Sequence, residues 1–149
     1  MLRIYLSVLV SVVVGCMGVA AWAATKSIGK DGVMVRSGPS LEHQVLFRAA
    51  LGYPVEIKEK KGDWVLIRDW EGDTGWVFEP MISEIRTAVI RTEGAKIRSG
   101  PGTDSDVKAK AHKGEIFKIL DKKDNWVKIG YYHDGVEAGW IRQDLVFGE

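Results

Sequence analysis

The chain has 149 residues, with 21 lysines and arginines against 20 aspartates and glutamates, and 46% of its residues are hydrophobic. A net charge of +1 gives no bulk attraction to nucleic acid or to an anionic membrane surface. The length suits one or two small domains. A domain of roughly 60 residues buries only about 60% of its unfolded-chain surface, so two such domains would gain stability by packing on each other.

Residues 1–23 differ in composition from the rest and predict an export signal. Arg3 precedes an apolar run over residues 4–14, and small residues follow up to Ala21 and Ala23. A basic start, an apolar centre and small residues before the cut are typical of a secretory signal helix, so we expect cleavage after Ala23. The remaining chain is therefore expected to be exported to the periplasm or another extracytoplasmic compartment.

Two other interpretations of this segment stay open. Val13-Val14-Gly15-Cys16 resembles the lipobox of bacterial lipoproteins, in which Cys16 would receive the lipid and become the new N-terminus. Alternatively, residues 4–24 could remain as an uncleaved anchor, because at 1.5 Å per residue they can cross a bilayer of about 30 Å. In both cases the protein would contact a membrane only through its N-terminus. Cys16 is the only cysteine, so no disulfide is expected in the exported part.

Beyond residue 24 the pattern indicates short strands separated by turns. Residues 55–60 alternate apolar and charged side chains with period two, which is typical of a strand with one buried face. Glycine and proline in Ser37-Gly38-Pro39-Ser40 predict a turn. In the first half we expect strands at 33–36, 55–60, 64–68 and 74–78, a short apolar piece at 81–82, and a strand or irregular segment at 45–50.

The second half repeats the first. Val35-Arg36-Ser37-Gly38-Pro39 recurs as Ile97-Arg98-Ser99-Gly100-Pro101 at an offset of 62 residues, and the same offset relates Trp64 to Trp126. A two-residue insertion then raises the offset to 64. The matching strands are expected at 95–98, 107–111, 116–120, 126–129, 139–142 and 145–146.

A period of this length indicates two domains, because it is longer than the unit of a solenoid or propeller. We place the first domain at residues 28–82 and the second at 94–147. The connector, residues 83–93, holds apolar residues and is expected to carry strand ends between the domains.

Short strands with these turns favour a small closed β-barrel, because a short sheet avoids exposed edges by curling on itself. Both halves resemble the bacterial SH3 family, through V-x-V-R-S-G-P near the start and then G-D-W-V-x-I and T-G-W-V. The resemblance covers residues 28–82 and 88–146. It predicts an all-β protein of two tandem SH3-like β-barrels with about five strands each, behind the signal helix. It implies a binding or targeting module of the cell envelope.

Trp64 and Trp126 are the first candidates for ligand contact. Lysine is rarely buried, so Lys128 should point away from the core, and by alternation Trp126 should do the same. The repeat extends this to Trp64. An outward tryptophan offers a large contact area at low entropic cost, and in SH3 domains at large the tryptophan at this place lines the peptide groove. The alternative is that each ring covers loops or an interdomain contact.

Further candidates lie in the turns. Arg36 and Arg98 could bind a ligand carboxylate through the guanidinium fork, or they could bond the carbonyl groups of their own loops. The β-hairpin tips of the two halves differ in sequence, and loops are where duplicated domains diverge in recognition. Trp70, Tyr131 and Tyr132 in these tips are therefore candidate contact residues.

The exported chain offers no recognisable catalytic constellation. It has no cysteine, and His43, His112 and His133 fall at unmatched places in the repeat, without a metal-ligand spacing. We expect a protein that is not an enzyme and uses no cofactor or metal. The expected partner is a cell-wall peptide or an envelope protein. The alternative function is a structural adaptor of a periplasmic or membrane protein complex without wall binding.

Overall fold

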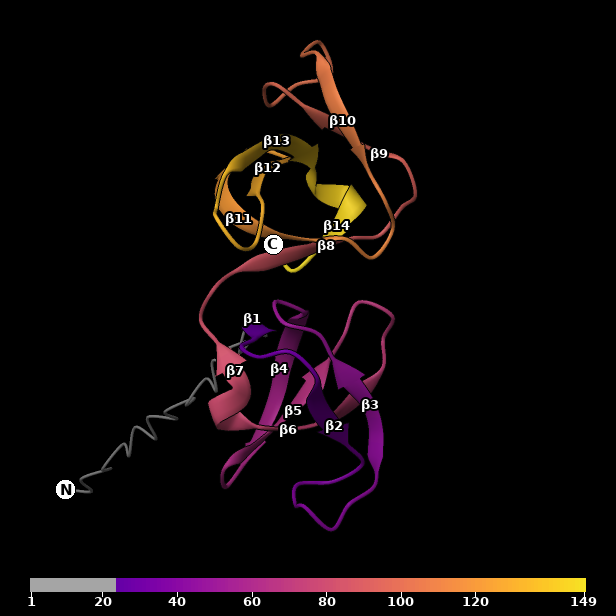
Figure 1. Ribbon diagram of the computed structural model, residues 1–149, viewed down its shortest axis with the longest axis vertical. Coiled ribbons are helices and arrows are strands. Elements are labelled where there is room, and N and C mark those ends of the chain that lie inside the picture. Colours follow the sequence, from indigo (N-terminus) through magenta and orange to yellow (C-terminus); the bar gives the residue numbers. More distant parts are fainter. Residues whose placement is uncertain (1–23) are drawn as a thin grey trace, which may run out of the picture.

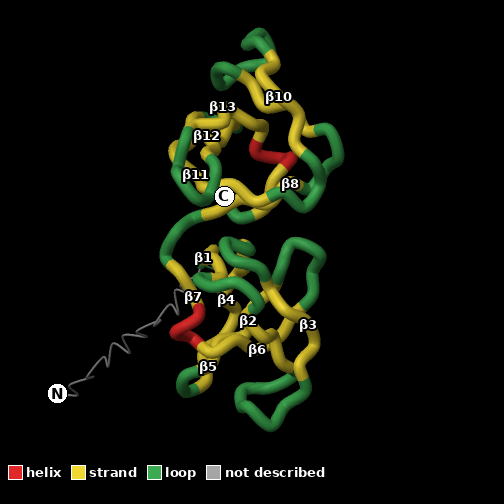
Figure 2. Tube along the Cα trace, viewed as in Figure 1, coloured by secondary structure: helices red, strands yellow, loops and turns green. Residues whose placement is uncertain are grey.

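The computed structural model describes residues 24–149, and the expected signal segment with Cys16 lies outside the described residues. The described chain forms two β-domains that follow one another along the sequence (Figure 1). Strands and loops make up nearly all of it, and the helical segments are short 3₁₀ turns (Figure 2). Within residues 24–149 there is no helix of the length and apolar character needed to cross a membrane.

The first domain is a seven-stranded antiparallel sheet with the strand order β3-β2-β6-β5-β4-β1-β7. Its elements are β1 (Thr25–Ile28), β2 (Val33–Arg36), β3 (Val45–Ala49), β4 (Pro54–Lys61), β5 (Trp64–Arg68), β6 (Thr74–Phe78), the 3₁₀ turn η1 (Glu79–Met81) and β7 (Ile82–Ser83).

The second domain repeats this topology element by element, in the order β10-β9-β13-β12-β11-β8-β14. Its elements are β8 (Thr87–Ile90), β9 (Ala95–Arg98), β10 (Val107–Ala111), β11 (Ile116–Lys123), β12 (Trp126–Gly130), β13 (Glu137–Arg142), the 3₁₀ turn η2 (Gln143–Leu145) and β14 (Val146–Phe147). For residues 24–149 the prediction of an all-β chain with a duplicated domain is confirmed.

Each sheet has seven strands where about five were expected. β1 was not predicted, and β8 lies in the connector at residues 83–93, where only strand ends were expected. β8 carries no alternating pattern, since all four of its residues are buried. Ala88 and Ile90 belong to the core of the second domain, whereas the Thr87 hydroxyl donates to the carbonyl of Gly52 in the first domain at 2.6 Å. A strand buried on both faces has no polar face to mark its period.

The two cores use equivalent residues. Val65 and Ile67 on β5 are buried in the first core, and Val127 and Ile129 on β12 are buried in the second. The intervening side chains lie on the other side of each strand, and Trp64 and Trp126 are half-buried there. The expected facing of β5 and β12 is therefore found in both domains.

The same end of each domain faces the other. The β5–β6 hairpin and the β3–β4 turn of the first domain lie toward the second domain, whose matching hairpin and turn lie toward the first (Figure 1). Besides the Thr87 bond, the buried Ser27 hydroxyl on β1 donates to the carbonyl of Ile85 in the short connector at 2.6 Å. The buried Thr87 bond joins the two domains directly, and the partly buried Ser27 bond holds the connector on the first domain.

Candidate ligand-binding site

Trp126 lines an open pocket on the second domain. The residue begins β12 immediately after the turn at Asn125, and alternation along the strand directs its ring away from the core. The pocket has a volume of about 660 Å³. Its lining comes from the segment after β8, the β9–β10 loop, the start of β12, the end of β13, η2, β14 and the last residue: Arg91, Thr103, Asn125, Trp126, Arg142, Gln143, Asp144, Val146 and Glu149.

The equivalent tryptophan of the first domain is covered by a second aromatic ring. Trp64 pairs with Phe78 across β5 and β6, and their ring centroids lie 5.7 Å apart. The repeat replaces Phe78 with Arg142 in the second domain. The Arg142 guanidinium binds Asp144 through Nε at 3.0 Å and Nη2 at 2.5 Å. This ion pair takes the place of the Phe78 ring, and the pocket at Trp126 is open.

The pocket combines an aromatic surface with polar groups. Glu149 at its edge accepts hydrogen bonds from Gln143 Nε2 at 3.0 Å and Lys122 Nζ at 2.7 Å. Arg91 is exposed, and within residues 24–149 its guanidinium forms no ion pair. Such a pocket can bind an extended polar chain, with Trp126 as the apolar contact and Arg91 as the partner of a carboxylate.

Arg36 and Arg98 are engaged in their own loops. Arg36 Nη1 donates to the carbonyls of Leu41 and His43 at 3.0 and 2.9 Å. Arg98 Nη1 donates to the carbonyls of Thr103 and Ser105, both at 2.9 Å. In each domain the arginine therefore shapes the loop between the second and third strands. In the second domain this loop brings Thr103 to the Trp126 pocket.

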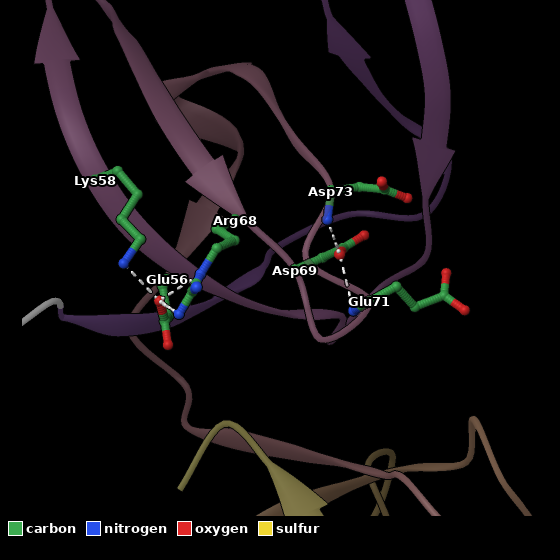
Figure 3. Close-up of polar contacts among 6 residues, drawn as sticks. All are labelled: Glu56, Lys58, Arg68, Asp69, Glu71 and Asp73. Atoms are coloured by element: carbon green, nitrogen blue, oxygen red, sulfur yellow. Dashed lines mark hydrogen bonds and ion pairs between the residues drawn. The ribbon is translucent and has the colours of Figure 1, made fainter.

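The β-hairpin tip of the first domain is closed by a buried carboxylate. Asp69 Oδ1 accepts the backbone N–H groups of Glu71 and Asp73 at 3.0 and 2.9 Å (Figure 3). Its Oδ2 accepts the Tyr53 hydroxyl at 3.0 Å, and burial together with the Asp69 charge raises the pKa of Tyr53. Oxygen atoms of Asp69, Glu71 and Asp73 lie within 4.8 Å of one another, but both carboxylate oxygens of Asp69 already accept these hydrogen bonds.

An ion-pair cluster lies beside this tip (Figure 3). Glu56 on β4 accepts from Arg68 Nη2 and pairs with Lys58 Nζ, both at 2.8 Å (Figure 3). Both cations are paired with the Glu56 carboxylate within the first domain. They offer no free group to a ligand.

The structure does not bring the candidate residues of the hairpin tips to the Trp126 pocket. Trp70 is half-buried and lies at the domain interface, with Lys113 Nζ 5.5 Å from its ring centroid. Tyr131 is 52% exposed and packs on Phe117, whereas Tyr132 packs on Gly52 of the first domain. Tyr131 and Tyr132 line a different pocket, between the domains.

Sequence reasoning missed the polar residues around Trp126. Arg91, Asn125 and Gln143 come from three separate segments, and none of them belongs to a motif. The usable signal was the replacement of Phe78 by Arg142 within the repeat. It indicated that the two tryptophans have different surroundings.

The fold and the outward tryptophan in each half define tandem SH3-like domains. Family comparison agrees, because residues 29–84 and residues 93–146 each match a family model described as a bacterial SH3 domain. The chain belongs to the bacterial SH3 domain family, with two copies in tandem.

Two relatives carry the names of amidases. A Bacillus subtilis protein named as an N-acetylmuramoyl-L-alanine amidase, YrvJ, is 31% identical over 130 residues, covering 80% of this chain and 24% of the relative. A Staphylococcus epidermidis protein named as a cell wall amidase, LytH, is 35% identical over 65 residues, covering 44% of this chain and 22% of the relative. The chain thus spans about a quarter of the length of these relatives.

Solved structures with similar segments include two proteins of NlpC type. NlpC2 from Trichomonas vaginalis is 19% identical with a TM-score of 0.37, over 85% of this chain and 48% of the other. An NlpC/P60 family protein from Bacillus cereus is 14% identical with a TM-score of 0.39, over 83% of this chain and 56% of the other.

Proposed function

We propose that this protein is a non-catalytic cell-wall-binding protein whose second domain holds the ligand at Trp126. The observation that carries the proposal is the open pocket beside Trp126, where the equivalent Trp64 is covered by Phe78. Membership of the bacterial SH3 family supports a role at the cell wall, as do relatives named as wall amidases. An exported location follows from the same proposal.

The ligand that fits this pocket is a short peptide with a free carboxylate. Arg91 supplies a guanidinium that can bind a carboxylate through two hydrogen bonds, and Asn125 supplies both a donor and an acceptor for peptide groups. The Trp126 ring supplies apolar contact area. Peptide stems of the cell wall have this chemistry, so we take cell-wall peptide as the ligand class.

Co-sedimentation of the purified protein with insoluble peptidoglycan tests the proposal. We expect Trp126→Ala to weaken binding about tenfold or more, since loss of an aromatic contact at the centre of a binding site costs about 2 kcal/mol. Trp126→Phe should retain part of the binding. The matched control is Trp64→Ala, which removes the equivalent ring from the first domain and should leave binding within about twofold.

Two further outcomes would decide against the proposal. Equal losses in Trp64→Ala and Trp126→Ala would mean that the open pocket carries no special role. Absence of co-sedimentation by the unchanged protein at two salt concentrations would overturn wall binding. It would favour the adaptor function, with a periplasmic or membrane protein as the partner.

A further inference from the structure

Beside the Thr87–Gly52 hydrogen bond, the contact between the domains includes two equivalent halves. In one half, Trp70 of the first domain lies against Lys113 of the second, with Nζ 5.5 Å from the ring centroid. In the other, Tyr132 of the second domain lies so close to Gly52 of the first that an added Cβ would be 2.6 Å from the ring. The 62-residue offset relates Trp70 to Tyr132. We call these contacts the Trp70 half and the Tyr132 half.

A carboxylate anchors the neighbouring turn in both halves. In the Tyr132 half, the Leu51 backbone N–H donates to Asp31 Oδ1 at 3.3 Å. In the Trp70 half, the Lys113 backbone N–H donates to Glu93 Oε2 at 3.0 Å. The same offset relates Asp31 to Glu93 and Leu51 to Lys113. The two halves therefore share an aromatic ring, a turn and a carboxylate in equivalent places.

The two carboxylates differ in how their other oxygen is used. Glu93 Oε1 is hydrogen-bonded to His112 Nδ1 at 2.5 Å. Within residues 24–149, Asp31 forms no ion pair. The residue equivalent to His112 is Ala50, whose side chain is too short to reach Asp31. The Trp70 half thus has an imidazole beside its carboxylate, and the Tyr132 half has only the Ala50 methyl group at the equivalent position.

A pocket of about 560 Å³ lies in the Tyr132 half, and Asp31 and Ala50 both line it. Both domains contribute to its lining, which consists of Asp31, Ala50, Leu51, Ile116, Tyr131, Tyr132 and His133. Tyr131 is 52% exposed and presents aromatic surface to the pocket. The Tyr132 ring already has a cation beside it, because Lys118 Nζ lies 5.1 Å from its centroid.

We propose that this interdomain pocket binds the primary ammonium group of an amine-bearing ligand, between the Asp31 carboxylate and the Tyr131 ring. An ammonium group donates charge-assisted hydrogen bonds to a carboxylate and is attracted to the face of an aromatic ring. The Trp70 half fills the equivalent region with nitrogen groups of its own, the His112 imidazole and the Lys113 ammonium. The ligand would supply to Asp31 what His112 supplies to Glu93.

The direct test uses cadaverine (1,5-diaminopentane) and the purified full chain, observed by NMR of the backbone amides. We expect saturable shifts confined to residues 31, 50–52 and 131–133. The uncharged probe 1,5-pentanediol has the same length and should shift none of them. Equal binding of the diol and the diamine would overturn the proposal, because the site would then recognise hydroxyl groups or the alkyl chain.

Asp31→Asn removes the charge while keeping an acceptor for the Leu51 N–H, so it should weaken cadaverine binding at least tenfold. The matched control is Asp121→Asn. Asp121 is also exposed and accepts a backbone N–H, from Lys122 at 2.8 Å, but it does not line the pocket. Unchanged cadaverine binding in Asp31→Asn, or an equal loss in Asp121→Asn, would contradict the assignment.

A reciprocal pair of substitutions tests the equivalence of the two halves. Ala50→His should place an imidazole on Asp31 and abolish the cadaverine shifts. His112→Ala should free Glu93 and add a second set of shifts at residues 93 and 112–114. If Ala50→His leaves cadaverine binding intact, the amine does not lie at Asp31.

The amine can come from a soluble molecule or from a free amino group of a wall peptide. Peptidoglycan with acetylated amino groups separates the two sources. Weaker co-sedimentation after acetylation, seen with the unchanged protein but not with Asp31→Asn, assigns the amine to the wall. If acetylation changes the co-sedimentation of both proteins equally, Asp31 does not bind the wall amine, and the amine is assigned to a soluble molecule. The inference does not rest on the proposed function, because Trp126→Ala should leave cadaverine binding unchanged.

Discussion

The two domains share a fold but differ in what lies beside equivalent residues. On the surface that carries the outward tryptophan, the first domain places Phe78 against Trp64, and the second places the ion pair of Arg142 and Asp144 near Trp126. The first arrangement packs two aromatic rings against each other, which stabilises the domain. The second leaves the ring open to a ligand. Thus one change in a neighbouring residue separates a structural tryptophan from a candidate binding tryptophan.

The hairpin tips show the same division. In the first domain Tyr53 and Asp69 form a partly buried hydrogen bond that closes the tip. At the equivalent positions the second domain has Glu115 and Tyr131, so the aromatic residue and the acidic residue have changed places. Glu115 accepts the backbone N–H of His112 at 3.1 Å instead, and Tyr131 is free to face the interdomain pocket. The predictions below test this contrast between the domains.

Gly52→Ala should have the largest effect on stability. Gly52 has φ +79°, where an alanine costs about 1–2 kcal/mol, and the added Cβ would also displace Tyr132. The equivalent Gly114 has φ +90° and no atom within 4 Å of an added Cβ. We expect the free energy of unfolding in urea to fall by about 3 kcal/mol in Gly52→Ala and by about 1–2 kcal/mol in Gly114→Ala. Equal losses would mean that the interface contributes little.

Asp69→Ala should have the next largest effect. It removes the acceptor of two backbone N–H groups and of the Tyr53 hydroxyl, so we expect a loss of about 2–3 kcal/mol. The control is Asp134→Ala in the second tip, where an exposed carboxylate accepts only the Val136 N–H. It should cost about 0.5 kcal/mol. A similar loss in both variants, measured by thermal unfolding, would show that burial of Asp69 is unimportant.

Thr87→Val should cost about 1–2 kcal/mol, because it leaves the buried carbonyl of Gly52 without its donor while the side-chain shape is kept. The equivalent Thr25 is half-buried, and within residues 24–149 its hydroxyl forms no side-chain hydrogen bond to another residue. Thr25→Val should therefore be nearly neutral. Hydrogen exchange at Gly52 and Tyr53 would report whether the loss is local to the interface.

The pair of His112 and Glu93 should give a small, pH-dependent contribution. The hydrogen bond to Glu93 raises the pKa of His112, so its stabilisation is complete below the usual value of 6.5 and is lost as the pH rises through the higher folded pKa. The Lys113 N–H and then His112 lower the pKa of Glu93. The contribution of the Glu93 charge to stability is therefore present above pH 4.5 and is lost as the pH falls through the lower folded pKa.

Thermal unfolding of His112→Gln and the unchanged protein should therefore differ most at roughly pH 5 to 6.5 and converge at higher pH. Both side chains are exposed, so the difference in Tm is expected to be small. A difference that grows above pH 7 would mean that the imidazole acts through packing rather than charge. Glu93→Gln serves as the partner control. It should show the same loss at roughly pH 5 to 6.5 and a further loss that persists at higher pH, because the Glu93 carboxylate also accepts the Lys113 N–H.

The sequence was sufficient for the fold because the repeat gave two independent records of one pattern. Val65 and Ile67, with Val127 and Ile129, marked the buried face of the same strand twice. β1 was missed, and β8 was expected only as strand ends in the connector, because the contacts of both strands are long-range. β8 is buried on both faces by its own core and by the first domain, so it has no polar alternation.

The sites were harder to predict, because their residues meet only in three dimensions. Trp126 was found from alternation, but Arg91 and Gln143 reach it from distant segments. The guanidinium groups of Arg36 and Arg98 bond their own loops, as the local alternative allowed. The difference at Asp31 and Ala50 is recognised only by comparison with Glu93 and His112, the equivalent residues in the other half of the interface.

The equivalent halves of the interface also bear on how such a chain arises. Two identical copies that meet through the same hairpin and turn form a symmetric dimer, in which each contact occurs twice. Joining the copies in one polypeptide makes that association intramolecular, and the effective concentration no longer depends on the amount of protein. Fusion also lets the two copies change separately. A mutation such as the one separating Ala50 from His112 then alters one half and leaves the other intact, which a dimer of identical chains cannot do.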